Sequence, residues 1–150
     1  MRMPAEMPAE MPVGAMRTKG WEARLAAVME AARETPYVLG EHDCFRLACH
    51  AICALTGEDR WPEFAGRYRT KGEALRVIAE YGASFDRAFS WFFGCAPADR
   101  KLARRGDIVK FMQEGEAHLG VCLGIRAAVL GDEGLMYVDI ADCEHCWRVG

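Results

Sequence analysis

The apolar residues change their period once along the chain, and this change restricts the fold more than any other feature. Before Arg105-Gly106 they recur at helical spacing, and after it they lie in short β-rich runs between Gly or acidic turns. A chain that forms helices first and strands afterwards is typical of α+β proteins, in which an antiparallel sheet packs against helices. The length of 150 residues suits a single domain of this kind.

Four helices are expected in the first part of the chain. One begins near Cys44 and ends at Gly57, and it is apolar on several sides, which is typical of a buried central helix. The other helices are expected over 21–34, from a capping box at Thr70 to Gly82, and from Ser84 toward Phe93. The strands of the second part are expected over 107–112, 118–123, 127–130, 135–140 and 147–149.

The first residues differ in composition from the rest. Met-Pro-Ala-Glu occurs twice within residues 1–18, and repeated proline prevents helical hydrogen bonding, so this segment is predicted to be a disordered tail. Residues 19–150 then form one domain. The start has no apolar core of the kind found in signal peptides, and no segment approaches the roughly 18 apolar residues of a membrane span. We therefore expect a protein that is made in the cytoplasm and has no membrane span.

Charge and cysteine content exclude two classes of protein. Lys plus Arg number 19 and Asp plus Glu 22, and a net charge of −3 argues against a nucleic-acid partner held by phosphate contacts. The odd count of seven cysteines argues against a disulfide framework and for reduced thiols packed as small hydrophobes. Cys143 and Cys146 form a C-x-x-C pair, but this supplies only two of the four ligands of a structural zinc site. A structural zinc site is therefore not expected.

The most informative stretch is Gly40-Glu41-His42-Asp43-Cys44, which leads directly into the apolar helix. A cysteine at a helix N-terminus faces free backbone N–H groups and the positive end of the helix dipole, and both favour the nucleophilic thiolate. Asp43 can cap the helix. A buried helix cysteine beside an ordinary cap explains the same residues.

A catalytic cysteine needs a base from elsewhere in the chain, and His118 is the candidate. It opens the predicted strand His118-Leu119-Gly120-Val121-Cys122-Leu123-Gly124. Just before it, Gly106-Asp107-Ile108-Val109 forms a turn that enters another apolar strand. Taken alone, His118 is better explained as a solvent-exposed residue at a strand end, and only its combination with the other motifs favours a catalytic role.

The order of these three motifs resembles the NlpC-type cell-wall endopeptidases, which are small papain-like proteins. The resemblance covers roughly residues 37–130. Residues 66–70 (Gly-Arg-Tyr-Arg-Thr), residues 147–150 (Trp-Arg-Val-Gly) and a Trp-containing N-terminal helix are also similar to small NlpC-like proteins from the tail gene clusters of phages and gene transfer agents.

The resemblance implies a hydrolase that needs no cofactor and cleaves the peptide stems of bacterial peptidoglycan. Cys44 would attack the amide carbonyl and His118 would act as general base and then acid. The partners would be peptidoglycan and other proteins of a phage-like tail tip, so that the protein becomes a virion component. Such delivery would agree with the lack of a signal peptide.

The third catalytic position departs from the family pattern. The family usually carries a polar residue on the strand after the His strand, and the matching position is Leu130 or Gly131, neither of which can orient an imidazole. Asp132 and Asp139 are the nearby candidates for that role. His42, close to Cys44, could tune the thiolate or simply cap a loop.

A structural or assembly component of the tail tip is the alternative function. The dense aromatic segment Phe89, Trp91, Phe92 and Phe93 is expected in the core, but an exposed cluster would mark a protein–protein surface. Activity against peptidoglycan separates the two functions.

Overall fold

The computed structural model describes residues 15–150, and most of the predicted tail therefore lies outside the described residues. Four α-helices precede all six strands in the described chain. The helices are α1 (Trp21–Ala32), α2 (Cys44–Thr56), α3 (Lys71–Ala79) and α4 (Phe85–Phe93). The strands are β1 (Ala98–Asp99), β2 (Ile108–Gln113), β3 (Glu116–Cys122), β4 (Arg126–Gly131), β5 (Gly134–Asp139) and β6 (His145–Trp147). Short 3-10 turns occur at Trp61–Glu63, Arg100–Leu102 and Ile140–Asp142.

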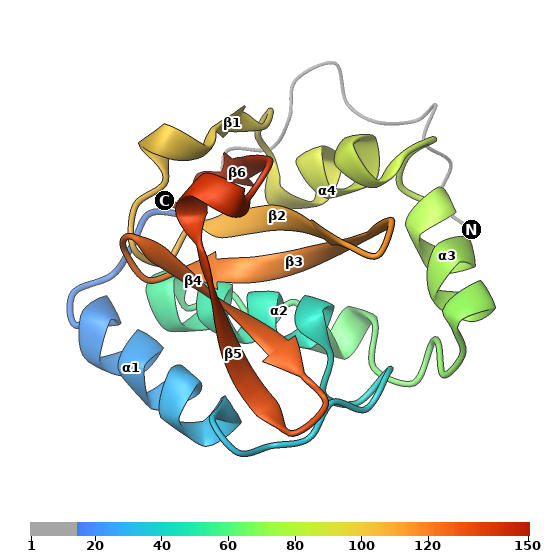
Figure 1. Cartoon of the computed structure of the whole chain (residues 1–150), viewed down its shortest axis with the longest axis horizontal. Coiled ribbons are helices and arrows are strands. Elements are labelled where there is room, and N and C mark those ends of the chain that lie inside the picture. Colours follow the sequence, from blue (N-terminus) through green and yellow to red (C-terminus); the bar gives the residue numbers. More distant parts are fainter. Residues whose placement is uncertain (1–14) are drawn as a thin grey trace.

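The six strands form one antiparallel sheet in the order β1-β6-β2-β3-β4-β5 (Figure 1). Strands β2 and β3 pair along their whole length, whereas β4 pairs with β3 only at Val121 and Cys122 and then diverges. The hairpin of β4 and β5 consequently crosses the face of the molecule at a steep angle to β2 and β3 (Figure 1). The predicted α+β architecture with an antiparallel sheet is confirmed.

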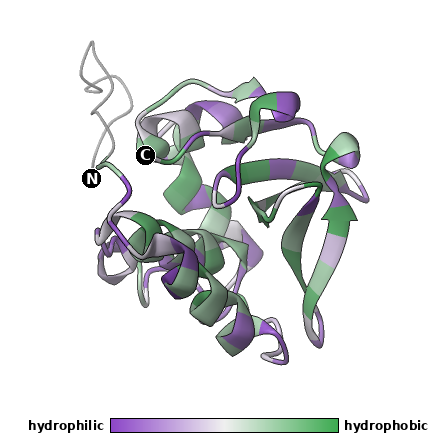
Figure 2. Ribbon diagram, turned by 90° about the vertical axis from the view of Figure 1, so that its left-hand side faces the viewer, coloured by the Kyte–Doolittle hydropathy of each residue, from purple (hydrophilic) through white to green (hydrophobic). Residues whose placement is uncertain are grey.

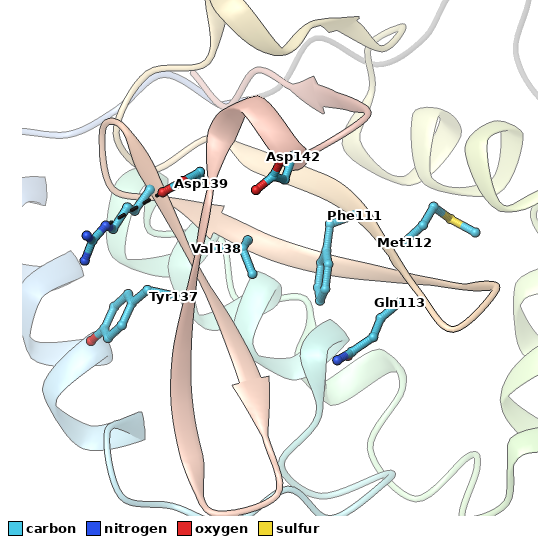
Figure 3. Close-up of a pocket in the computed structure, with 8 residues that line it drawn as sticks. Phe111, Met112, Gln113, Tyr137, Val138, Asp139 and Asp142 are labelled. Carbon is cyan, nitrogen blue, oxygen red and sulfur yellow. Dashed lines mark ion pairs between the residues drawn. The ribbon is translucent and has the colours of Figure 1, made fainter.

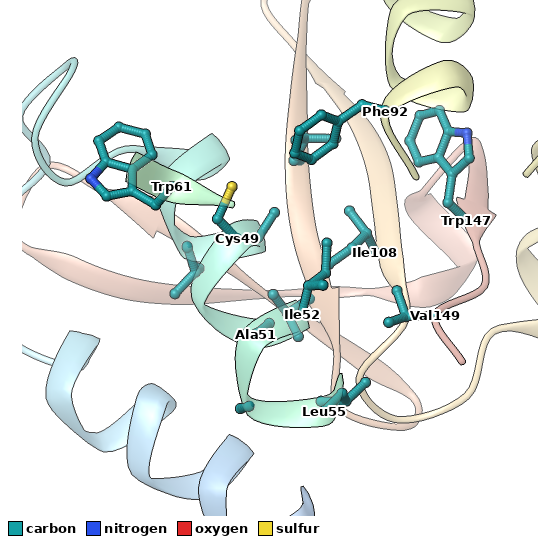
Figure 4. Packing of buried hydrophobic residues seen from close by; sticks show 14 of the residues in the cluster. Cys49, Ala51, Ile52, Leu55, Trp61, Phe92, Ile108, Trp147 and Val149 are labelled. Carbon is teal, nitrogen blue, oxygen red and sulfur yellow. The ribbon is translucent and has the colours of Figure 1, made fainter. Parts of the chain in front are cut away.

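Helix α2 lies at the centre, between α1 and the sheet (Figure 1). Its apolar residues occur on several faces, so eight of its thirteen residues are buried. Leu119 and Val121 of β3 belong to the same hydrophobic cluster as Leu47 and Leu55 of the helix. The same cluster extends to Trp61, Phe92 and Trp147 (Figure 4). Burial of this much apolar surface is the main favourable term in folding.

Hydrophobic and hydrophilic residues alternate in bands along the helices and strands (Figure 2). On the sheet this alternation creates a second, smaller cluster on the face away from α2. It contains Val109, Phe111, Cys122, Ala127, Val129, Cys143 and Cys146. Because consecutive side chains of a strand point to opposite faces, Val109 and Phe111 lie on this outer face and Ile108 on the inner one.

The aromatic segment of α4 forms part of the core, as expected. Phe89, Trp91 and Phe92 are buried, and Phe93 is half-buried with its ring 5.3 Å from that of Trp147. Trp147 donates a hydrogen bond from Nε1 to the buried Ser90 hydroxyl at 3.0 Å. This satisfies the indole N–H inside the core.

Helix boundaries follow the capping residues. Asp43 and Gly57 bound α2, the capping box of Thr70 and Glu73 opens α3, and Ser84 caps α4, all as predicted. Two ends differ from the prediction, since α1 ends at Ala32 rather than residue 34 and α3 at Ala79 rather than Gly82. The two-residue strand β1 was not predicted, because so short a run carries no periodic signal.

The folded part of the chain begins before the predicted boundary at residue 19. Arg17 forms an ion pair with the fully buried Asp107 at 2.9 Å and donates to the backbone oxygen of Val149 at 2.8 Å. Asp107 also accepts from the N–H groups of Val149 and Arg104. One carboxylate thus joins the N-terminal segment, the C-terminal residues and the entry to β2, so the prediction of a tail through residue 18 is wrong for Arg17.

In the part of the chain that the structure describes, no helix has the length and apolar character needed to cross a bilayer.

Replacement of Asp107 by Ala should lower the free energy of unfolding by about 3 kcal/mol, because it leaves a buried backbone donor, a part-buried one and a guanidinium without their acceptor. Urea denaturation measures this change. Glu133→Ala removes an exposed carboxylate and serves as the control, with an expected change of less than about 0.5 kcal/mol. Equal effects of the two substitutions would contradict this account.

Candidate active site at the start of helix α2

Cys44 is the first residue of α2 and follows a tight loop. Val38 and His42 pair as an isolated antiparallel bridge, with the His42 N–H donating to the Val38 oxygen at 2.7 Å. Gly40 lies in this loop at a φ of 85°, and a Cβ there would meet the backbone oxygen of Tyr68 at 2.3 Å. Glycine is therefore required both by the left-handed conformation and by the close approach of the 66–70 segment.

Asp43 holds the helix start in place and is itself buried. Its Oδ1 accepts from the Arg46 N–H at 2.9 Å, as an N-cap does, while Oδ2 accepts from the Gly40 N–H at 2.8 Å and the Tyr68 hydroxyl at 2.6 Å. Burial and the adjacent carboxylate raise the pKa of Tyr68 far above its ordinary value, so Tyr68 remains a hydrogen-bond donor. The candidate supporting residue Asp43 is thus a structural cap that orients Cys44.

The sulfur of Cys44 lies against the edge of β3. The Cys122 N–H and oxygen bond to the β2 side, through Asp107 and Gly106, so by alternation the Leu119 N–H points to the other side, where β4 would continue. Since β4 has diverged there, this N–H is available and interacts with the Cys44 sulfur. The Cys44 sulfur therefore lies beside the part of β3 along which a regular β4 would pair.

Two opposing effects act on the Cys44 thiol. Burial is the larger and raises its pKa to about 11, whereas hydrogen bonds from the N–H groups of Leu119, Cys44 and Phe45 lower it. The sequence argument that the helix N-terminus favours thiolate therefore names a real effect, but burial outweighs it. The sulfur needs a proton acceptor before it can act as a nucleophile at neutral pH.

His118 is the third residue of β3, not the first as predicted, because the strand begins at Glu116. It lies opposite Phe111 in the ladder, and the two rings pack with centroids 5.3 Å apart at 32°. The imidazole therefore projects from the outer face of β3, one residue from the Leu119 N–H that meets the sulfur. Among the described residues no hydrogen bond joins Cys44 to His118, and the imidazole lies on the face of the sheet away from α2.

The candidates for a third catalytic residue lie at different places. A β3–β4 register continued beyond Val121 would put Gly131 opposite His118, but β4 diverges from β3 before that point, so neither Leu130 nor Gly131 pairs with β3 there. Asp132 follows Gly131 in the exposed β4–β5 turn, where its backbone oxygen accepts from the Tyr37 N–H at 3.4 Å. Asp139 pairs with Arg126 at the opposite end of this hairpin, about 16 Å along the strand from Gly131. The structure does not bring Asp139 to His118.

Two residues that the sequence analysis did not select lie at the site. Burial raises the pKa of Tyr37 to about 12, and the neighbouring Cys44, Asp43 and Glu116 add to this rise. Glu116 stands two residues before His118 on the same face of β3 and forms an ion pair with Lys71. Lys71 and, to a smaller extent, His118 lower the pKa of Glu116. The position of Tyr37 just before the Gly40 loop was the sequence signal for it, and no local signal marked Glu116.

His42 does not face the sulfur. Its side chain lines an open groove of about 620 Å³ between α1 and α2, together with Arg46 and His50, and Cys44 is not part of that lining. Burial and the Arg46 guanidinium lower the pKa of His42. Its role in tuning the thiolate, which the sequence left open, gains no support from this placement.

The C-x-x-C pair of Cys143 and Cys146 is buried in the outer cluster. Each thiol donates to a different backbone oxygen, Cys143 to Asp139 at 3.6 Å and Cys146 to Asp99 at 3.5 Å. Burial raises the pKa of both thiols to about 11. Within residues 15–150 no group of three His, Cys, Asp or Glu side chains is arranged to hold a metal ion.

A family model described as a domain of unknown function, DUF6950, matches residues 16–149. The chain belongs to this family. No curated protein and no solved structure matches it. The match begins one residue before Arg17 and ends at Val149, so the DUF6950 domain includes both segments that meet at Asp107.

In this DUF6950 domain, Tyr68→Phe should lower the free energy of unfolding by about 1–2 kcal/mol, because the buried Asp43 carboxylate loses one of its three donors. Chemical denaturation measures the loss. Tyr137→Phe is the matched control, since Tyr137 is half-exposed and its hydroxyl makes no hydrogen bond in the described structure. A loss of stability in the control as large as in Tyr68→Phe would refute the role of the buried bond.

Alkylation of Cys44 by iodoacetamide should report the state of its thiol as the pH changes. A pKa of about 11 means that the thiol form predominates at neutral pH, with a thiolate fraction of about 10⁻⁴ at pH 7. The rate in His118→Ala should therefore rise continuously with pH toward about 11. Mass spectrometry of the modified peptide gives the rate at each pH.

The alkylation rate of the wild type, compared with that of His118→Ala, tests whether His118 accepts the Cys44 proton. If His118 accepts the proton, wild-type Cys44 will react faster than Cys44 of His118→Ala at pH 7. Identical rates at every pH would show that the imidazole does not reach the sulfur.

Proposed function

We propose that this DUF6950 domain is a papain-like cysteine peptidase or amidase of NlpC type, with Cys44 as nucleophile and His118 as general base. The observation that carries the proposal is the placement of the Cys44 sulfur at the N-terminus of α2, against the backbone of β3 next to His118. A helix-borne cysteine beside a strand-borne histidine is the arrangement that the sequence resemblance implies. The expected substrates are the peptide stems of bacterial peptidoglycan.

The first half of the reaction forms a thioester. Cys44 Sγ attacks the amide carbonyl carbon while His118 accepts the thiol proton, and the imidazolium then gives that proton to the departing amine as the C–N bond breaks. The oxyanion that forms on the carbonyl oxygen would be held by the N–H groups of Cys44 and Phe45, since the Arg46 N–H is already bonded to Asp43. Water then hydrolyses the thioester, with His118 again as base.

Neither Leu130 nor Gly131 can orient the imidazole of His118, but three other residues near the site would take over part of this role. The Phe111 ring packs on the imidazole and restricts its rotation. Glu116, on the same face of β3, is the carboxylate that would favour the imidazolium formed during the reaction. The phenol of Tyr37, held neutral by its raised pKa, is a hydrogen-bond donor for the substrate carbonyl or the sulfur.

The proposed setting is the tail of a phage-like particle that carries the enzyme to the cell wall. It rests on the sequence resemblance at residues 66–70 and 147–150. In the fold these segments contain Tyr68, which bonds Asp43, and Val149, which bonds Asp107. Both contacts stabilise the fold, so the similarity of these two segments can be explained by the fold alone. The partners in the tail remain a proposal.

A catalytically weak assembly component of the tail tip is the second candidate function. Two observations favour it: the position where the resemblance implies a third polar residue is Leu130 or Gly131, neither of which can orient an imidazole, and burial raises the pKa of Cys44 to about 11. Both would slow a hydrolase without affecting a protein that only docks.

Digestion of purified peptidoglycan followed by mass spectrometry of the released fragments tests the proposal. The wild type should release fragments with new stem-peptide termini, and Cys44→Ala and His118→Ala should release none, a loss of at least about a hundredfold. Cys49→Ala is the matched control, because Cys49 is a buried thiol of the same helix with no proposed catalytic role. It should retain activity if it folds, which circular dichroism monitors.

Failure of the wild type to cleave peptidoglycan of several chemotypes, with Cys44 shown to be reduced, would overturn the hydrolase and favour the assembly component. Cleavage that persists in Cys44→Ala would overturn the assignment of the nucleophile.

A further inference from the structure

The outer face of the sheet contains a groove that lies beside the proposed catalytic site and shares only Phe111 with it. It encloses about 560 Å³ between one end of β2 and the edge strand β5 (Figure 3). Residues 111–113 of β2 form one wall, residues 137–139 of β5 form the other, and Arg126 and Asp142 complete the lining. Two strand segments thus face each other across open space.

The wall formed by β5 presents backbone groups without partners. The Leu135 N–H points away from β4, because it donates to the backbone oxygen of Arg33 at 3.1 Å. By the alternation of an antiparallel strand, the N–H groups of Tyr137 and Asp139 point the same way, and in the described chain no strand pairs with them. Arg33 covers the start of this edge and leaves Tyr137–Asp139 open.

The wall formed by β2 is similar. Strand β6 pairs with β2 only as far as Lys110, and the Glu144 N–H donates to the Lys110 oxygen. The backbone groups of Met112 point to the same side as those of Lys110, beyond the end of β6. The groove is therefore bordered by two unpaired strand edges.

The side chains give the groove an apolar floor and an acidic end. Phe111 and Val138 project into the space between the strands, whereas Tyr137 points away from it (Figure 3). Asp142 lies at one end and forms no ion pair with any described residue, while Asp139 is 3.9 Å from Arg126. Unpaired edges with apolar pockets for alternate side chains are the features by which proteins add an extended peptide to a sheet.

We propose that this groove binds an extended peptide segment of a partner protein, which adds to the sheet as a strand along the open edge of β5. Alternate side chains of the peptide pack on Phe111 and Val138, and a Lys or Arg lies near Asp142. The backbone N–H of Tyr137 donates to the peptide. This binding does not require the proposed hydrolase activity, although the groove shares Phe111 with the proposed catalytic site.

The sequence and the shape of the groove disfavour two other occupants. Residues 1–14 contain Pro4, Pro8 and Pro12, which lack the N–H that a strand needs, and Glu6 and Glu10, which Asp142 would repel. A second copy of the chain would have to insert a whole sheet edge between two walls, whereas a single extended strand needs only the space between them.

Selection from a displayed library of random linear peptides, with the full chain as target, tests the proposal. Enriched peptides should contain β-branched residues and a Lys or Arg, and their binding should slow hydrogen exchange of the Tyr137 amide. Tyr137→Pro removes the outward N–H while leaving the ladder to β4 intact, and it should weaken binding at least tenfold. Tyr137→Phe keeps the N–H and is the matched control, with unchanged binding.

The same peptides with N-methyl groups on alternate amides supply a test that needs no protein variant. One of the two N-methylated registers should lose binding at least tenfold in the wild-type protein. Absence of any enriched peptide, binding that Tyr137→Pro does not affect in a folded protein, or tolerance of both N-methylated registers would each overturn the proposal. A shift to dimer on size exclusion with protected Tyr137 amides would identify a second copy as the occupant and would also overturn it.

Discussion

Burial of helix α2 is the constraint on which the remaining structure depends. The N–H groups in the first turn of a helix have no partner within that helix, and α2 is enclosed by α1, α4 and the sheet over most of its length. Asp43 supplies the acceptor, and the Gly40 N–H and the Tyr68 hydroxyl satisfy the second oxygen of this buried carboxylate. The loop before the helix and the segment after it are therefore held together at the residue that precedes Cys44.

The same burial determines the chemistry available to Cys44. An exposed helix N-terminus would stabilise a thiolate, but here the sulfur loses more from desolvation than it gains from three backbone N–H groups. A neutral thiol at rest and a base nearby suit a nucleophile that is activated only when a substrate fills the site. They suit a structural cysteine equally well, so the role of His118 decides between enzyme and assembly component.

The divergence of β4 from β3 has two consequences for function. It frees the Leu119 edge of β3 for the Cys44 sulfur, and it turns the β4–β5 hairpin so that the outer edge of β5 faces β2 across a groove. A fully paired sheet would have neither feature. The proposed catalytic site and the proposed peptide-binding groove thus arise from one irregularity of the sheet, and they share Phe111, which packs on His118 and lines the groove.

Local sequence determined the helices and the fold class. The cap at Asp43, the capping box at Thr70 and the change of period near Gly106 each act within a few residues, so they could be read without the tertiary structure. Only the fold decided which distant residues meet. The alternation of side chains along β3 places Glu116 on the same face as His118. The β4–β5 register places Asp139 at the far end of the hairpin from Gly131. Tertiary packing brings Arg17 into contact with Asp107. These contacts depend on strand register and on burial. Both are determined by the packing of the whole core, so no local pattern in the sequence predicts them.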